Sequence, residues 1–398
     1  MFNTLQKTLL ACTVFICALI MLPVITEASE VKGDYTVSND GSSTSVKGIH
    51  GTEFLNFECT KTYANGYTRK DKFKYYLKTN TSYYDIPGLT NTNVLGTNCK
   101  TMVPQGMCKM NDLVLISAYD SESRYLSKQG LSVCPERNLY IYVLNSDGLL
   151  ATMVLPFRSH VGGLTYDGTN VWIVNGETDY KDNKTVSSDK KRVYYFTNKQ
   201  VNGAVYYCHA SVYKSAQINI KNQYKVLDID AAYCTYYENK LWFGTFNSEE
   251  TGMVYAYDIE YNSNNRPTLT KVGDLEAPRA TQGMAFYRFS GKTYLIFSTS
   301  YGRNKQVGGF ANKLIVYKPT DYDNLNSKAG YKDYHKGARL KDITMPYMSE
   351  NLCMKGMLMY IVFESGAEKY WENKNDRVPE KDICDKYCEL DFYKVAIE

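Results

Sequence analysis

A short pattern that recurs five times limits the folds open to this chain. In each copy an apolar segment ends near a Pro or a polar residue, a triplet related to Gln-Gly-Met follows, and a second apolar run comes next. The copies begin at Pro104, Pro156, Asp228, Pro278 and Pro346, and the copy at Asp228 is degenerate. A repeat of about 40–70 residues made of short strands is typical of a β-propeller, in which each repeat forms one blade.

Each copy is predicted to form a blade of up to four strands, because turn residues between apolar runs are hairpin signals. First strands are expected at residues 107–110, 164–166, 233–236, 284–287 and 352–354. Second strands are expected at 113–117, 171–175, 241–245, 294–299 and 358–364. Third strands are expected at 139–144, 192–196, 253–259, 313–317 and 389–395. Fourth strands are expected at 149–155, 204–212, 269–275 and 340–345.

The last copy reaches Glu398 without a fourth strand. Residues 97–104 (TNCKTMVP) read like residues 151–156 (ATMVLP), although no blade precedes them. We therefore predict that this N-terminal segment completes the last blade, because a closed ring leaves no exposed sheet edges. A linear solenoid would need polar capping repeats, and the sequence has none. The predicted fold is all-β: a five-bladed β-propeller over residues 96–398, closed by an N-terminal strand.

The residues before the repeats divide into two parts. Residues 1–28 are predicted to be a signal peptide, because Lys7 is followed by an almost wholly apolar run at residues 9–25 and by a small-residue cleavage pattern. The run is close to spanning length, so an uncleaved anchor is the alternative. Residues 29–95 do not follow the repeat and are predicted to be a flexible leader and an N-terminal extension, with a small separate domain as the alternative. We expect a secreted or cell-surface-associated protein.

Charge and cysteine content limit the partners and the disulfide bonds that the protein is expected to have. The net charge of +4 is small and dispersed and no nucleic-acid-binding motif is present, so we expect no nucleic acid partner. Two of the 11 cysteines, Cys12 and Cys17, lie in the predicted signal peptide, which leaves nine. An odd number leaves at least one free thiol, and export to an oxidising compartment predicts a mixture of buried thiols and one or two disulfides. No later segment is long and apolar enough to span a membrane.

The innermost strands of a propeller line its central channel, so the residue beside the small residue of each triplet is the first place to look for a site. Polar residues stand there in all five copies: Gln105, His160, Asp230, Gln282 and Glu350, with Asn351 beside the last. Their neighbours are apolar, which predicts a polar ligand site at the channel. The alternative is a hydrated plug that closes the channel through hydrogen bonds.

A second polar set lies where the second strands enter loops of variable length, which often carry function. This set consists of Tyr119, Asp120, Glu177, Asn247, Tyr301, Arg303 and Glu364. The candidate acids of the two sets are Glu177, Asp230, Glu350 and Glu364. His160 is the candidate base or metal ligand because it titrates nearest neutral pH, and Arg303 is a candidate anion clamp. Solvated surface charge is the alternative for each residue of the second set.

No motif fixes a reaction. The chain has no Gly-x-Ser-x-Gly elbow, no His-Glu-x-x-His and no phosphate loop. Carboxylate oxygens around the channel could bind Ca²⁺, although the set includes amides and lacks tight local spacing. Trp172 and Trp242 lie within predicted second strands and are expected in the core. Trp371 lies in a predicted loop and is the better candidate for an exposed ring that stacks on a sugar.

Three segments carry a resemblance to known proteins. Residues 159–168 (SHVGGLTYDG), 298–303 (STSYGR) and 363–367 (FESGA) resemble phrases of exported bacterial β-propeller proteins of undefined function. The resemblance covers residues 97–398 and implies the same fold.

More remotely, the blade pattern is similar to that of the strictosidine synthase and SMP-30/gluconolactonase propellers. That resemblance implies metal ligands at the channel, and Glu350 and Asp230 would be the acidic ones. Gln105 and Gln282 depart from a carboxylate-rich site, and the five copies depart from the six blades of those proteins.

Three functions follow from these observations. The long variable loops and the lack of a catalytic motif favour a propeller that binds a glycan, a peptide or a cell-envelope component. A metal-assisted hydrolase or lactonase that uses the channel acids and His160 is the first alternative. A glycosidase is the second, and it needs two carboxylates at a defined separation.

Overall fold

The structure, a computed structural model, describes part of the 398-residue chain. The described residues are 36–39, 42–45, 54–62, 68–76, 81–89, 92–93, 98–99, 101–121, 138–158, 160–174, 191–210, 215–220, 222–301, 313–320, 339–345, 348–367, 370 and 386–393. The predicted signal peptide, Glu177, Arg303 and Trp371 lie outside them.

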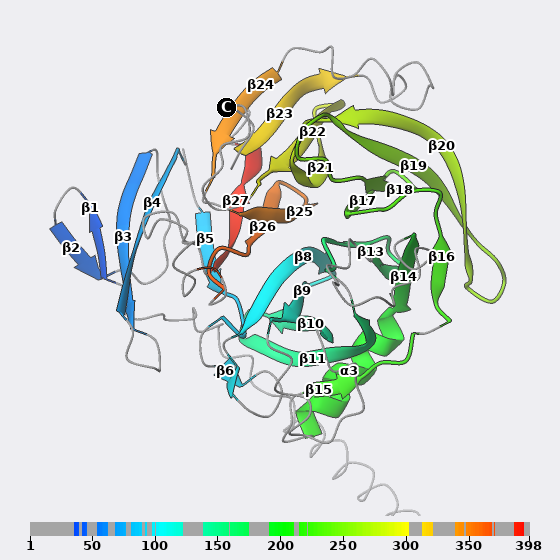
Figure 1. The fold of residues 1–398 in the computed structure, drawn as a ribbon, viewed down its shortest axis with the longest axis horizontal. Coiled ribbons are helices and arrows are strands. Elements are labelled where there is room, and N and C mark those ends of the chain that lie inside the picture. Colours follow the sequence, from blue (N-terminus) through cyan, green and yellow to red (C-terminus); the bar gives the residue numbers. More distant parts are fainter. Residues whose placement is uncertain are drawn as a thin grey trace, which may run out of the picture.

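Five sheets form the five blades of a closed β-propeller (Figure 1), which confirms the predicted fold. Blade 1 contains β8 (Met102–Met110), β9 (Leu113–Asp120), β10 (Asn138–Asn145), β11 (Gly148–Arg158) and β15 (Ser215–Gln217). Blade 2 contains β12 (Gly163–Tyr166), β13 (Asn170–Val174), β14 (Arg192–Thr197) and β16 (Tyr224–Val226). Blade 3 contains β17 (Tyr233–Tyr237), β18 (Lys240–Gly244), β19 (Gly252–Tyr261) and β20 (Pro267–Ala277).

The last two blades complete the ring. Blade 4 contains β21 (Thr281–Phe289), β22 (Lys292–Thr299), β23 (Lys313–Thr320) and β24 (Arg339–Thr344). Blade 5 contains β25 (Ser349–Lys355), β26 (Leu358–Phe363), β27 (Lys386–Asp391) and β5 (Thr81–Asp85). The first strand of each blade faces the centre and contacts its counterparts in the two neighbouring blades, including β25 against β8.

An N-terminal strand closes the ring, but it is not the predicted one. The outermost strand of blade 5 is β5, which pairs with β27 in antiparallel register from Lys386↔Asp85 to Leu390↔Thr81. The Tyr84 and Tyr387 rings stack across this pair with centroids 5.0 Å apart. The segment predicted for this role, residues 97–104, instead runs into β8, the innermost strand of blade 1. The ring therefore includes residues N-terminal to the expected boundary at 96.

A helix replaces the fourth strand predicted at residues 204–212. α3 (Asn198–Ala210) follows β14, and the outer strand of blade 2 is the later β16. The helix begins with a capping box: the Thr197 hydroxyl accepts a hydrogen bond from the Gln200 amide nitrogen (3.3 Å), and Gln200 Oε1 accepts one from the Thr197 amide nitrogen (2.9 Å). Such reciprocal bonds satisfy orphan N–H groups at a helix start and so favour helix over strand here.

Residues before the ring form a sheet of their own. It contains β1 (Thr36–Asn39), β2 (Ser42–Ser45), β3 (Phe54–Thr62) and β4 (Thr68–Tyr76) in the order β2-β1-β3-β4. Two short strands, β6 (Thr92–Asn93) and β7 (Asn98–Cys99), pair with each other. β1 and β2 pair as a hairpin within the segment predicted to be a flexible leader.

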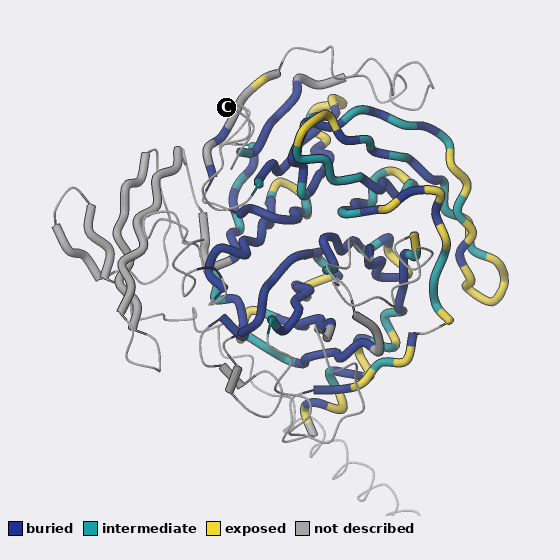
Figure 2. Tube along the Cα trace, in the orientation of Figure 1, coloured by how far each residue is buried: buried dark blue, intermediate teal, exposed yellow. Residues whose placement is uncertain are grey.

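The core lies between the blades. Buried apolar side chains of the described residues form five clusters, and each cluster joins two successive blades. Residues 139–144 of β10 are all buried, as expected for a strand that is apolar on both faces. Trp172 and Trp242 are fully buried, which confirms their predicted place in the core. Figure 2 shows that exposure increases toward the outer hairpin of β19 and β20.

The glycines of the repeat let the blades meet at the axis. A Cβ on Gly163 would lie 2.6 Å from the backbone nitrogen of Cys234 in blade 3, and one on Gly106 would lie 2.9 Å from that of Leu164 in blade 2. A Cβ on Gly283 would lie 2.8 Å from Cα of Asn351. Side chains at these positions would push neighbouring innermost strands apart, so the recurring glycine has a packing cause.

Candidate functional site

The pairing of the first two strands brings the candidate residues to one face of the ring. In blade 5, Ser349 at the start of β25 pairs with Phe363 at the end of β26. In blade 1, Met102 pairs with Asp120 in the same way. The face at which innermost strands begin and second strands end is here called the upper face. It carries Gln105, Glu350 and Glu364.

A buried acid cluster joins blade 5 to blade 1 at this face. It consists of Gln105, Glu350, Glu364 and Tyr370, none of which is more than 7% exposed. Glu364 Oε2 accepts hydrogen bonds from Gln105 Nε2 (2.5 Å) and from the Tyr370 hydroxyl (2.8 Å). Glu350 is hydrogen-bonded to Glu364 through its carboxyl group. Residues 259 positions apart are thus in direct contact.

Burial and mutual repulsion favour a state in which the two carboxyl groups share one proton. Burial raises the pKa of Glu350 well above its ordinary 4.5, and the charge of Glu364 and the hydrogen bond to it raise this pKa further. Glu364 receives hydrogen bonds from neutral donors, and such bonds favour the charged form of a carboxyl group. In that state Glu350 carries the proton and Glu364 the negative charge.

Two tyrosines extend the cluster toward His160. Burial, followed by the charge of Glu364, raises the pKa of Tyr370 well above its ordinary value, so this hydroxyl stays a donor. A hydrogen bond links Tyr370 to the buried Tyr119. The half-buried His160 packs on the Tyr119 ring with centroids 5.4 Å apart.

Gln105 brings an unused acceptor into the cluster. Its Nε2 donates to Glu364 and to its neighbour's backbone, Pro104 O, at 2.9 Å. Its Oε1 is buried and has no hydrogen-bond partner among the described residues. A buried carbonyl oxygen without a partner is costly, by about 1–3 kcal/mol, and is uncommon in folded proteins.

The predicted channel position is polar in only three blades. Gly106 lies against Gly163 and Leu164, and Gly163 lies in turn against Tyr233 and Cys234. These contacts place Gly162 of blade 2 and Ala232 of blade 3 at the position of Gln105. The polar residues Gln105, Gln282 and Glu350 belong to blades 1, 4 and 5, which are consecutive around the closed ring. The polar set therefore lies on one side of the axis.

His160 and Asp230 each lie two residues before that position, so their predicted alignment was wrong. Asp230 is exposed in the segment before β17. Gln282 is half-buried, and its Nε2 donates to Ser300 O within its own blade, at 3.4 Å. Of the five predicted residues, the structure thus brings Gln105 and Glu350 together and adds His160 through Tyr119. The hydrogen bond given for Gln282 is to Ser300 and not to the acid cluster.

Asn351 crosses the axis of the ring. Its Nδ2 donates to the Leu164 carbonyl oxygen at 3.1 Å, which joins blade 5 to blade 2. Its Oδ1 accepts from the Leu352 amide nitrogen at 2.8 Å. Asn351 is fully buried. Asn351 alone thus makes the kind of hydrogen bond across the channel that the plug hypothesis assigned to the whole polar set.

The other predicted rim residues serve local structure. Asp120 is buried and accepts a 2.6 Å hydrogen bond from Thr101. Asn247 Oδ1 accepts from the backbone nitrogens of Glu249 (2.9 Å) and Glu250 (3.0 Å), as in a turn. The Tyr301 ring lies 6.0 Å from that of Phe246.

The described residues contain no group of three or more His, Cys, Asp or Glu side chains that could hold a metal ion. Among the described cysteines, Cys108, Cys234, Cys353 and Cys388 carry free thiols. The predicted disulfides would involve cysteines whose side chains lie outside the described residues. No described helix is long and apolar enough to cross a membrane.

Sequence reasoning missed Tyr370. This tyrosine follows β26 by a few residues in a segment with no periodic pattern, and its buried hydroxyl binds Glu364. The sequence instead favours the neighbouring Trp371 as an exposed ring that could stack on a sugar. The chain has 37 tyrosines, and no sequence signal distinguishes Tyr370 from the others.

Comparisons with known proteins give similarity of fold only. No family model matches the chain, and no curated protein matches it. Among solved structures, the Myxococcus xanthus glutaminyl cyclase is 9% identical, with 66% of this chain and 87% of that chain covered and a TM-score of 0.35. The Cps50 (Swd1) β-propeller domain of Myceliophteria thermophila is 6% identical (90% and 99% covered, TM-score 0.32). The exo-β-1,3-galactanase of Phanerochaete chrysosporium is 10% identical (77% and 64% covered, TM-score 0.36). Such low values carry no inference about site or reaction.

Proposed function

We propose that the protein is an exported propeller that binds a ligand at the acid cluster on its upper face. The observation that carries this proposal is the unpartnered Gln105 Oε1 beside the single negative charge shared by Glu350 and Glu364. Together they form a buried group of hydrogen-bond acceptors. A ligand that presents N–H or O–H donors, from a glycan, a peptide or a cell-envelope component, would satisfy them.

The half-buried His160 supports a route to this cluster. It lies on the Tyr119 ring, and Tyr119 is hydrogen-bonded to Tyr370 within the cluster. A ligand that approaches beside His160 would reach the acceptors through contacts with aromatic rings, which bind sugar faces and ammonium groups alike.

Binding to glycan and peptide arrays, followed by calorimetry on the best ligand, tests the proposal. Glu364→Gln removes the charge and Gln105→Leu removes the free acceptor, so each should weaken binding about tenfold or more. Asp230→Asn is the matched control, since it removes an exposed charge that lies outside the cluster. Equal affinity of all three variants and the native protein, or no binding to any array component, would contradict the proposal.

A second candidate, a hydrolase, rests on the unequal protonation of the acid pair. A neutral carboxyl group beside an ionised one is the arrangement that acid–base catalysis uses, with Glu350 as the proton donor. The direct hydrogen bond brings the two groups closer than the roughly 5–9.5 Å that glycosidases use, so the glycosidase hypothesis would require them to separate. Turnover of a lactone and glycoside panel that disappears in Glu350→Gln would favour the hydrolase over a binding protein.

A further inference from the structure

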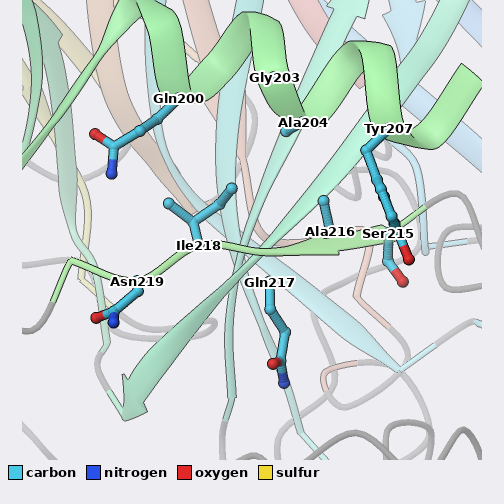
Figure 3. Close-up of a pocket in the computed structure, with 9 residues that line it drawn as sticks. All are labelled: Gln200, Gly203, Ala204, Tyr207, Ser215, Ala216, Gln217, Ile218 and Asn219. Atoms are coloured by element: carbon cyan, nitrogen blue, oxygen red, sulfur yellow. The ribbon is translucent and has the colours of Figure 1, made fainter.

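A concave site lies at the outer edge of blade 1, between α3 and β15. Its volume is about 550 Å³, within the range of small-ligand sites. Gly203, Ala204 and Tyr207 of α3 line one side, and Ala216, Ile218 and neighbouring residues line the other (Figure 3). The site belongs to none of the repeat positions that the channel hypothesis used.

Small residues on facing elements create this pocket. In Figure 3, Ala204 of α3 and Ala216 of β15 point toward each other, and Ile218 points toward the helix. A Cβ on Gly203 would meet nothing within 4 Å, so the helix leaves open space at this position. Glycine is an unfavourable residue in a helix interior, and no packing contact requires it here.

An exposed aromatic ring stands at one end of the pocket. Tyr207 extends from α3 toward β15 and is 55% exposed, which is unusual for so large a side chain (Figure 3). Asn219 places an amide group at the other end, beside Gln200, whose own amide group binds Thr197 and Gln223. The described residues of the lining include no acidic and no basic side chain. Ser215 Oγ, also in the lining, is buried without a hydrogen-bond partner among the described residues.

We propose that this pocket binds a neutral saccharide, with the Tyr207 ring as the surface on which a sugar ring stacks. The apolar face of a pyranose packs on an aromatic ring and on small aliphatic side chains, while its hydroxyl groups bind amide groups and hydroxyls. Tyr207, the small aliphatic residues, Asn219 and Ser215 supply these partners, and the described lining residues carry no charge. An anionic ligand would need a cation in the lining, and a cationic ligand would need an acid.

An extended peptide fits the site less well. A peptide would bind here by adding a strand beside β15, the outermost strand of blade 1. β15 has only three residues, and very short edge strands disfavour such pairing. Peptide binding is therefore an outcome of the test that would overturn the saccharide proposal.

Calorimetry with maltotriose, cellotriose and triacetylchitotriose tests the proposal on the full chain. Tyr207→Ala should weaken binding of the preferred trisaccharide about tenfold or more. Tyr206→Ala is the matched control, because Tyr206 is the adjacent residue of α3, is 80% exposed and does not line the pocket. It should bind like the native protein.

A second pair of variants separates pocket filling from loss of structure. Gly203→Leu places a side chain in the open space and should abolish binding while raising the melting temperature, since leucine favours helix. Asn202→Leu adds the same side chain at an exposed position outside the lining and should leave binding unchanged. The proposal is overturned if no trisaccharide binds, if only peptides bind, or if Gly203→Leu binds as well as the native protein. A negative result at this pocket would not bear on the ligand site proposed at the acid cluster. The Glu364→Gln variant should not alter binding at this pocket.

Discussion

The shared proton of the acid pair predicts how the stability of the ring depends on pH. Glu350 keeps its proton in the folded protein because burial and the neighbouring Glu364 raise its pKa. In the unfolded chain it loses that proton above its ordinary pKa of 4.5. Between these two pKa values the folded state binds one proton more than the unfolded state. The free energy of unfolding therefore falls as pH rises through this interval.

The difference of one bound proton sets how steeply the free energy of unfolding changes with pH. A difference of one bound proton changes the free energy of unfolding by about 1.4 kcal/mol per pH unit. Glu350→Gln keeps the hydrogen bond to Glu364 but has no proton to lose. Relative to the native protein, this variant should gain stability as pH rises above 4.5, with a slope that approaches about 1.4 kcal/mol per pH unit.

Urea denaturation of both proteins at about pH 5, 6 and 7 measures this slope. Glu249→Gln is the matched control, because it removes an exposed carboxyl group far from the acid cluster in sequence and should follow the native pH dependence. Parallel curves for the native protein and Glu350→Gln would refute the shared-proton arrangement. If Glu364→Gln alone removed the slope, the proton would reside on Glu364 and the assigned roles would be reversed.

Three further changes test the packing of the ring, each by the midpoint of urea unfolding. Gly163→Ala should cost about 1–3 kcal/mol, because its Cβ would lie 2.6 Å from the backbone nitrogen of Cys234. Trp172→Phe should cost a similar ~1–3 kcal/mol, since it removes the 2.6 Å hydrogen bond from Trp172 Nε1 to the buried Asp167. Deleting residues 1–96 should lower the midpoint below that of a chain that lacks only residues 1–80, because only the longer deletion removes β5; equal midpoints would show that β5 is dispensable.

Local patterns predicted most of the fold. The alternation of apolar runs and turn residues is a property of neighbouring positions, so hairpins such as β17–β18 and β25–β26 could be read directly from the sequence. The sequence also shows that the last blade lacks a strand. It does not show which segment supplies that strand, because β5 is a five-residue strand whose pairing with β27 depends on contacts between distant parts of the chain. The helix at α3 could have been predicted from the capping box of Thr197 and Gln200.

The candidate site was predictable where the repeat is regular. Gln105 and Glu350 stand beside the residues that pack at the axis, and Glu364 directly follows the second strand β26, so their convergence follows from the fold. In blades 2 and 3 the copies differ near the start of the innermost strand, and polarity alone misplaced His160 and Asp230 by two residues. Tyr370 could not be predicted, because it lies after β26 in a segment that has no periodic pattern to indicate its contact with Glu364.

Closure by β5 also bears on the order in which the ring can form during synthesis. β5 leaves the ribosome before any of the five innermost strands, while its partner β27 comes after all of them. The hairpins between them pair locally and can form early, whereas pairing across such a separation is slow. An incomplete chain therefore holds a free edge strand and an unformed acid cluster, since Gln105 meets Glu364 only when blade 5 docks. The complete acid cluster can therefore exist only after all five blades have been synthesised and the ring has closed.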